Sequence, residues 1–277
     1  MPWRARLELD YRHESGRTTA RFRHEGPLRI LQPLYPEGDA VCHNVLVHPP
    51  GGLVGGDRLD VDIRVAAGAH GLVTTPGAAR FYRSEGEAAV QHTRIAVEPG
   101  ARFEWLPLEA ICYSGCRAEN RLELSLAPGA ELLGWDVCAL GLPAAGQPFL
   151  QGRVLQHLEV KGAWLERGRI DAARPRLLDS PLGLAGRRCL GTLFFAAGEP
   201  IASHRVEQVL DTARQLLDAA PGAAVDAAAT SPHPQVIVVR VLAPLVEPAM
   251  DLLKLVRAAW RPLLWQREGT PSRLWAL

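Results

Sequence analysis

Hydrophobic and polar residues alternate strictly in several segments of the first two thirds of the chain. In segment 59–65, LDVDIRV, every second residue is Leu, Val or Ile, and the residues between them are charged. A period of two is typical of a strand with one buried and one exposed face. The same pattern, interrupted by a turn in which Gly is followed by Ala, occurs at 93–107, 121–135 and 158–166.

The turn glycines of these units are evenly spaced. Gly68, Gly100, Gly129 and Gly162 repeat with a loose period of about 30 residues, which is typical of repeat architectures. The period favours stacked β-hairpin units. An ordinary antiparallel β-protein that reuses Pro-Gly turns is the alternative that the spacing leaves open.

The last third of the chain has a different pattern. Ser203 can cap a helix with an apolar stripe, and 246–264 shows a second stripe of helical period. Between them, QVIVVRVLA at 235–243 is a continuous apolar run, which indicates a buried strand. The small, turn-rich segment 218–234 is predicted to be an exposed loop.

These patterns together predict a mostly-β fold. We expect an elongated stack of β-hairpin layers, β-helix-like, with a small C-terminal two-helix element. Since no long linker interrupts the chain, we expect a single domain over 1–277, β-rich over 1–200 and with a helical flank at about 203–264.

Composition narrows the function classes. The 277 residues are 47% hydrophobic and 22% charged, with a formal net charge of +1, so nothing favours binding to nucleic acid or to an anionic membrane. No apolar run is long enough to span a bilayer, and Met1 to Asp10 lacks the apolar core of a signal peptide. The five cysteines are scattered and odd in number, which favours buried, reduced thiols in a cytoplasmic protein.

The most unusual stretch is HPPGGLVGGDRL, residues 48–59. A phosphate-binding P-loop needs Lys and Ser or Thr where this chain has Asp57 and Arg58. A dinucleotide-binding turn needs a following helix, whereas the residues after Gly56 alternate as a strand does. The stretch is therefore a wide turn that presents Asp57. The spacing favours an Asp57 that accepts hydrogen bonds from the loop's own amides over an Asp57 with a chemical role.

No catalytic motif is visible in the sequence. The chain has neither Gly-x-Ser-x-Gly nor His-Glu-x-x-His, and its nine histidines are dispersed. Asp136 follows Trp135, and Glu166 follows Leu165, so both carboxylates are either buried functional groups or residues on the exposed side of a strand. Their positions alone favour the exposed side of a strand. This profile suits a binding or scaffolding protein better than an enzyme.

Four further segments extend the glycine-rich motif into a family pattern. The motif, together with TTPGAARFYRS at 74–84, EWLPLEAICYSG at 104–115, LLDSPLGLAGRRCLGTLFF at 177–195 and the C-terminal AAWRPLLWQREGTPSRLWAL, resembles the urease accessory protein family UreD, called UreH in some bacteria. The resemblance extends from about residue 25 to the C-terminus. It implies an elongated β-stack with a pair of helices and a protein that is not an enzyme.

The resemblance also implies partners and a cargo. Members of the family bind apo-urease and UreF, and UreF recruits the GTPase UreG. They help to deliver nickel into the urease active site, and an internal tunnel is the proposed route. For this chain, the resemblance therefore implies that no cofactor is tightly bound and that nickel is in transit.

Specific residues follow from the resemblance. A passage for Ni²⁺ needs oxygen or imidazole ligands that hold the ion weakly. We expect Asp57, Asp136 and Glu166 to line this path, with Thr75 and Arg80 shaping its wall. The chain departs from the family pattern at 79–80, where Ala and Arg replace the frequent hydroxyl residue and Lys.

The C-terminal segment is rich in Trp and Arg, residue types that anchor interfaces. We expect Trp260 to lie in the core, and Arg261 and Arg273 to contact a partner. Two alternatives to nickel delivery stay open. One is a purely structural scaffold that holds apo-urease open without contacting nickel. The other is a β-helix hydrolase, which would need carboxylates that converge in one cleft.

Overall fold

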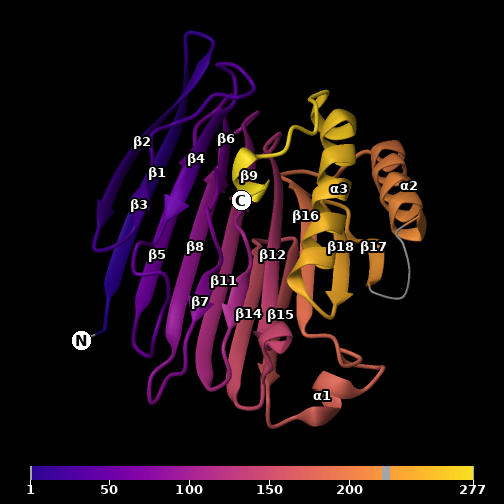
Figure 1. Ribbon diagram of the computed structural model, residues 1–277. Coiled ribbons are helices and arrows are strands. Elements are labelled where there is room, and N and C mark those ends of the chain that lie inside the picture. Colours follow the sequence, from indigo (N-terminus) through magenta and orange to yellow (C-terminus); the bar gives the residue numbers. More distant parts are fainter. Residues whose placement is uncertain (1, 220–224, 277) are drawn as a thin grey trace.

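The computed structural model describes residues 2–219 and 225–276. The chain forms three layers: two β-sheets packed face to face, and two long helices against the outer side of the second sheet (Figure 1). The strands of both sheets run nearly vertically in Figure 1 and lie side by side, from β1 and β2 at one end of the molecule to β17 and β18 at the other.

The first sheet has seven strands. Its five central strands are parallel, and an antiparallel strand closes each end. In spatial order the strands are β15 (Trp164–Asp171), β14 (Gly152–Val160), β11 (Cys116–Leu126), β8 (Ala89–Val97), β5 (Arg58–Val65), β1 (Arg4–Glu14) and β2 (Arg17–Glu25).

The second sheet has eleven strands. Its main path is β17 (Asp226–His233), β18 (Val236–Ala243), β16 (Cys189–Ala197), β12 (Glu131–Leu142), β9 (Arg102–Leu106), β6 (His70–Thr74), β4 (Cys42–Val47) and β3 (Arg29–Ile30). Three short strands pair off this path, namely β7 (Ala79–Phe81), β10 (Ala110–Cys112) and β13 (Gln147–Pro148).

The predicted β-stack is confirmed, but the strands of most units do not pair with each other. The turns at Gly68, Gly100 and Gly129 each connect a strand of the seven-stranded sheet to a strand of the eleven-stranded sheet. Each strand pairs instead with its counterpart in the next unit, in parallel. The turn at Gly162 differs, because it joins β14 and β15 as an antiparallel hairpin.

Alternation explains why the two sheets pack together. The inward residues of β5, β8, β11 and β14 are mostly apolar and fill the layer between the sheets, while their outward residues are charged. The strands of the eleven-stranded sheet are apolar on both faces, since a second apolar layer separates this sheet from the helices. This difference is what the continuous apolar run of β18 indicated.

The two predicted helices are confirmed as α2 (Ser203–Ala219) and α3 (Val246–Trp265), and the buried strand between them is β18. The shorter elements are α1 (Pro175–Asp179), η1 (Pro143–Ala145) and η2 (Arg273–Ala276). In the described part of the chain, no helix has the length and apolarity needed to cross a membrane.

The predicted loop at 218–234 is wrong over much of its length. Residues 226–233 form β17, which pairs antiparallel with β18 at the edge of the eleven-stranded sheet. The backbone groups of β18 need partners on this side, and the small residues of β17 supply them although their side chains carry little strand propensity. Residues 220–224 of the predicted loop lie outside the described residues.

Candidate functional site

A cavity of about 270 Å³ lies between the two sheets. β5, β8 and β11 contribute residues on one side, and β9, β12 and the segment 75–80 contribute residues on the other. Its wall is largely apolar but includes His48, Gln91, Thr93, Asn120 and Asp136. A mostly apolar pocket with a few convergent polar groups is typical of a ligand-binding site.

Asp136 is the carboxylate in the cavity wall. It projects from β12 toward the seven-stranded sheet, where Asn120 Nδ2 and Gln156 Nε2 donate hydrogen bonds to its two oxygens at 2.8 and 3.0 Å. Burial raises the pKa of Asp136 to about 6, the two amide donors oppose this shift, and the charge of Glu166 adds to it. Asp136 is therefore an ionised but poorly solvated carboxylate at neutral pH.

Glu166 lies near Asp136 but outside the cavity wall. It projects from β15, and Arg240 Nε of β18 donates a hydrogen bond to Glu166 Oε2 at 2.9 Å, so the pair bridges the two sheets. The electrostatic effect of Glu166 on Asp136 indicates that the fold brings these two predicted residues together. Asp136, Thr192 and Arg240 stand in register on neighbouring strands, so a row of polar residues, which we call the polar layer, extends from the cavity to the ion pair within the otherwise apolar space between the sheets.

Asp57 lies apart from these two carboxylates. It is buried before β5, and its two oxygens accept hydrogen bonds from the backbone amides of Trp3 at 2.7 Å and Val54 at 2.8 Å. This is the interpretation in which Asp57 stabilises its own loop. Asp57 does not line the cavity, but its charge acts on His48, which does.

The two predicted wall residues, Thr75 and Arg80, both line the cavity. The Thr75 hydroxyl donates to the Gly77 carbonyl at 3.0 Å and accepts from the Leu108 amide at 2.8 Å, so it connects two loops. Arg80 belongs to β7, and its side chain is exposed. A role for either residue in metal passage stays a prediction.

The two arginines expected at a partner surface differ in placement. The expectation for Arg261 is wrong, because its side chain is fully buried and Arg261 Nη2 donates to Glu37 Oε2 at 2.7 Å. Arg273 is exposed in η2, and its contact with a partner stays a prediction. Trp260 lies in the core as expected, and its indole donates to the Val209 carbonyl at 3.0 Å.

Arg261 belongs to a group that we call the helix-anchoring ion cluster, formed by Glu37, Glu104, Arg257 and Arg261. Arg257 Nη2 donates to Glu104 Oε2 at 2.7 Å, and Arg261 Nε lies 3.3 Å from Glu104 Oε1. Burial raises the pKa of Glu104, but Arg257, His70 and Arg261 outweigh this effect and hold the pKa below its usual range. The cluster fixes α3 to the eleven-stranded sheet.

Sequence reasoning missed Asn120, Gln156 and His48. Asn120 and Gln156 each occupy an inward position in an otherwise apolar alternation, and they pair in register on β11 and β14. A polar residue that breaks the buried face of a strand is the signal that could have found them. No comparable signal marks His48, which comes directly after β4.

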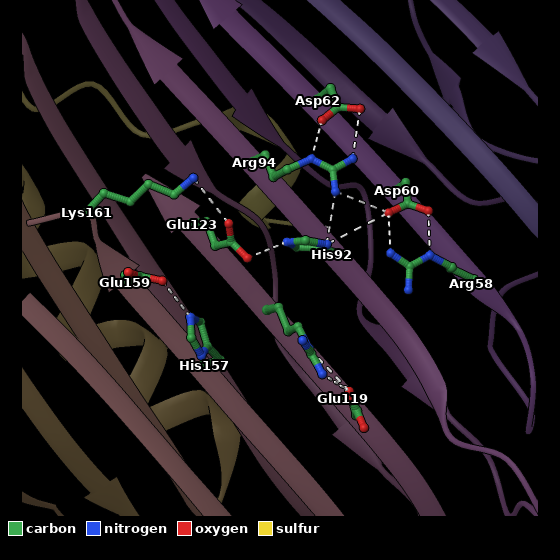
Figure 2. Close-up of polar contacts among 11 residues, drawn as sticks. Arg58, Asp60, Asp62, His92, Arg94, Glu119, Glu123, His157, Glu159 and Lys161 are labelled. Atoms are coloured by element: carbon green, nitrogen blue, oxygen red, sulfur yellow. Dashed lines mark hydrogen bonds and ion pairs between the residues drawn. The ribbon is translucent and has the colours of Figure 1, made fainter. Parts of the chain in front are cut away.

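The outer face of the seven-stranded sheet carries a dense network of charges, shown in Figure 2. His92 Nε2 lies 2.8 Å from Glu123 Oε1, and the Arg94 guanidinium donates to both oxygens of Asp62 at 2.5 and 3.0 Å. Arg58 pairs with Asp60 in the same way. These groups satisfy one another on the side of the sheet opposite the cavity, so we interpret them as a solvated face.

All five cysteines are free and buried, as the sequence predicted. Over residues 2–219 and 225–276, no group of three or more His, Cys, Asp or Glu side chains is placed to hold a metal ion.

Comparison with known proteins identifies the family. The model of the UreD urease accessory protein family matches residues 4–276. Urease accessory protein UreD of Variovorax paradoxus (strain S110) is 65% identical over 276 residues, and that of Paracidovorax citrulli (strain AAC00-1) is 63% identical over 277 residues. The protein of the same name from Polaromonas sp. (strain JS666 / ATCC BAA-500) is 62% identical over 277 residues, and each alignment covers 100% of both chains.

These relatives decide between an enzyme and an accessory protein. They are named as proteins that assist urease, so the chain is an accessory protein and not an enzyme, and the alternative of a β-helix hydrolase is wrong. The match over 4–276 includes the glycine-rich motif, the cavity wall and both long helices. The chain therefore belongs to the UreD family of urease accessory proteins.

Proposed function

We propose that this chain binds apo-urease and helps to deliver nickel into its active site along the polar layer between the two sheets. The observation that carries the proposal is Asp136, a poorly solvated carboxylate in a cavity wall, held by amide donors from the opposite sheet. Carboxylate oxygens hold Ni²⁺ less tightly than thiolates do, which suits an ion that must also leave. Glu166 extends the path beyond the cavity.

Membership of the UreD family supports a proposal for the partners. We propose that the chain forms a complex with apo-urease and UreF, and that UreG joins through UreF. Arg273 is a candidate contact because it is exposed at the C-terminal end, next to the helical layer. Five free, buried thiols support a location in the reducing cytoplasm.

Isosteric carboxylate variants test the delivery role. The chain would be co-expressed with the urease subunits and the other accessory proteins, and the nickel content of purified urease would be measured by atomic emission. We expect Asp136→Asn to lower nickel per urease about tenfold, in line with the effect of removing an oriented metal-site group. Glu123→Gln on the outer face is the matched control, since its carboxylate points away from the cavity.

Complex formation must be measured in the same preparations. A pull-down on the tagged chain should recover urease and UreF equally with both variants. If Asp136→Asn and Glu166→Gln both left nickel loading unchanged, the delivery role would be wrong. The chain would then be a structural scaffold. The Glu166–Arg240 pair and the hydrogen bonds from backbone amides to Asp57 are also compatible with this role, because both stabilise the fold.

A further inference from the structure

The segment between β15 and β16 projects from the rest of the molecule. We call residues 172–188 the α1 loop, because they contain α1 and connect these two strands. Figure 1 shows α1 and the residues after it beyond the ends of β16 and β18, away from both long helices. The α1 loop therefore lies outside the three layers, at one end of the strands.

The α1 loop has a fixed conformation. The Leu184 amide donates a hydrogen bond to the Leu177 carbonyl at 2.7 Å, and Arg188 Nη2 donates to Asp179 Oδ1 at 2.6 Å. Leu178 and Leu184 belong to the buried cluster between the two sheets. Because these contacts order the loop before any partner binds, little conformational entropy is lost on binding.

Leu182 lies at the tip of this loop. It is 100% exposed, the highest value among the large apolar residues that the structure describes. Its amide donates to Ser180 Oγ at 3.2 Å, so the backbone at the tip is also held. The leucines on either side of it in the loop, Leu178 and Leu184, are buried. The fold thus presents one apolar side chain on a rigid support, which suits an anchor that a partner would bury.

An apolar pocket of about 160 Å³ lies next to the end of the α1 loop. Its wall is formed by η1, by the segment that joins β18 to α3, and by Arg188 at the end of the loop. Leu245, which is 40% exposed, belongs to this wall. Exposed apolar surface that is bordered by polar residues is typical of sites for protein partners. The pocket has space for an apolar side chain of such a partner.

The α1 loop is basic. It contains four arginines and one aspartate, although the whole chain has 31 basic and 30 acidic residues. Arg188 pairs with Asp179, whereas Arg174 and Arg176 are exposed, and the described residues supply no hydrogen bond or ion pair to the side chains of these two. Exposed guanidinium groups without a counter-charge attract a partner that carries carboxylates.

We propose that the α1 loop and the adjoining pocket form a docking surface for an acidic segment of a partner protein. Leu182 packs against the partner, an apolar side chain of the partner enters the pocket, and neighbouring carboxylates pair with Arg174 and Arg176. A nucleic acid would leave the pocket empty, and a second copy of the chain would bring arginines against arginines. This inference rests on the proposed complex with apo-urease and UreF, one of which supplies the acidic segment.

The first experiment measures the affinity of the full chain for purified apo-urease and for purified UreF, each by itself, with biolayer interferometry. We expect Leu182→Ser to raise the Kd for one of the two about tenfold, since truncation of a buried anchor has effects of this size. Leu34→Ser is the matched control, because Leu34 is 51% exposed and lies between β3 and β4, at the other end of the eleven-stranded sheet. Both side chains are exposed, so both variants should unfold at the wild-type temperature.

The second experiment tests the arginines and the pocket. Arg174→Glu/Arg176→Glu should lower the association rate with the same partner about tenfold at low salt and remove most of its salt dependence. Arg21→Glu/Arg23→Glu is the control, because it changes the net charge equally at exposed positions of β2, at the other end of the seven-stranded sheet. Ala144→Trp fills the pocket from an exposed position in its wall and should weaken binding of the same partner.

The outcomes separate this inference from the proposed complex. If both partners bind and neither responds to Leu182→Ser or to Arg174→Glu/Arg176→Glu, the inference is wrong and the complex stands. If neither partner binds the wild-type chain, the inference and the complex are both wrong. Equal losses for both partners would also overturn the inference, because one surface serves one partner. Co-sedimentation with phosphatidylglycerol vesicles that Leu182→Ser abolishes would assign the surface to a membrane and would overturn it as well.

Discussion

The helix-anchoring ion cluster and the inter-sheet cavity both contain buried polar groups, but only in the cluster are the buried charges paired with opposite charges. In the cluster, the guanidinium of Arg257 and the carboxylate of Glu104 face each other at 2.7 Å, and no cavity separates them. In the cavity, Asp136 receives amide hydrogen bonds but no cation, and His48 Nε2 and Thr93 Oγ1 have no partner among the described residues.

The difference separates buried groups that are paired with an opposite charge from buried groups that are not. Paired buried charges compensate the free energy of their desolvation, and removing one partner is strongly destabilising. A buried group without a counter-charge lowers the stability of the folded state, so its presence favours a role other than stability. Substitutions in the two regions should therefore change the free energy of unfolding with opposite signs.

The largest effect is expected in the ion cluster. Arg257→Met leaves Glu104 buried and without its closest cation, and we expect it to lower the free energy of unfolding by about 3–5 kcal/mol in urea titrations. The double variant Glu104→Gln/Arg257→Met should recover much of this loss. Arg214→Met is the control, since its pair with Asp211 is exposed and should contribute less than about 1 kcal/mol. Equal losses in the two single variants would contradict the comparison.

A smaller effect of opposite sign is expected at Asp136. Its pKa is about 6 in the folded state against an ordinary 3.8, so the folded chain binds the proton more tightly, and stability falls as pH rises through this range. At pH 7 the charge should cost about 1–3 kcal/mol. Asp136→Asn should therefore stabilise the chain at pH 7, and the gain should shrink below pH 6 and vanish near pH 4.

Urea titrations at several pH values check this prediction. Asp62→Asn is a suitable control, because Arg94 lowers the pKa of Asp62 and its carboxylate stabilises the fold above its ordinary pKa. A gain for Asp136→Asn that does not depend on pH would mean that shape, and not charge, produces it.

The smallest effect is expected at Thr93. Thr93→Val replaces an unpartnered hydroxyl with a methyl group of similar size, and we expect a gain of about 0.5–1 kcal/mol. Thr74→Val is the matched control, since the Thr74 hydroxyl donates to the Leu106 carbonyl at 2.7 Å and accepts from the Trp275 indole at 2.9 Å. The midpoint temperature of thermal unfolding should rise for Thr93→Val and fall for Thr74→Val. If it fell for both variants, the Thr93 hydroxyl would have a hydrogen-bond partner in solution.

The comparison also shows what the sequence could and could not predict. Local periodicity predicted the strands around Gly68, Gly100 and Gly129 and both long helices, because it reports which face of each element is buried. It could not predict whether two successive strands pair with each other or with the next unit, since both arrangements bury the same residues. The strand at 226–233 was missed for a related reason, because its partner β18, and not its own residues, makes it a strand.

The candidate site also depends on partners that are distant in the sequence. Asp136 was singled out through the family resemblance, whereas its position alone favoured the exposed side of a strand, because its amide donors come from strands of the opposite sheet. Arg261 was misplaced because its partner Glu37 is 224 positions away in the sequence. A Trp- and Arg-rich segment has the same composition whether it faces a partner or closes over a buried carboxylate.

The antiparallel strands at the two ends of the seven-stranded sheet have a consequence for the behaviour of the chain in a crowded cell. A stack of parallel strands offers at each end a row of free backbone groups on which another chain could grow, as in a fibril. Here β2 and β15 cover those ends, and each carries arginines along its length, including Arg21, Arg23, Arg167 and Arg169. Like charges brought edge to edge repel, so these arginines disfavour the pairing of a terminal strand with the same strand of a second molecule.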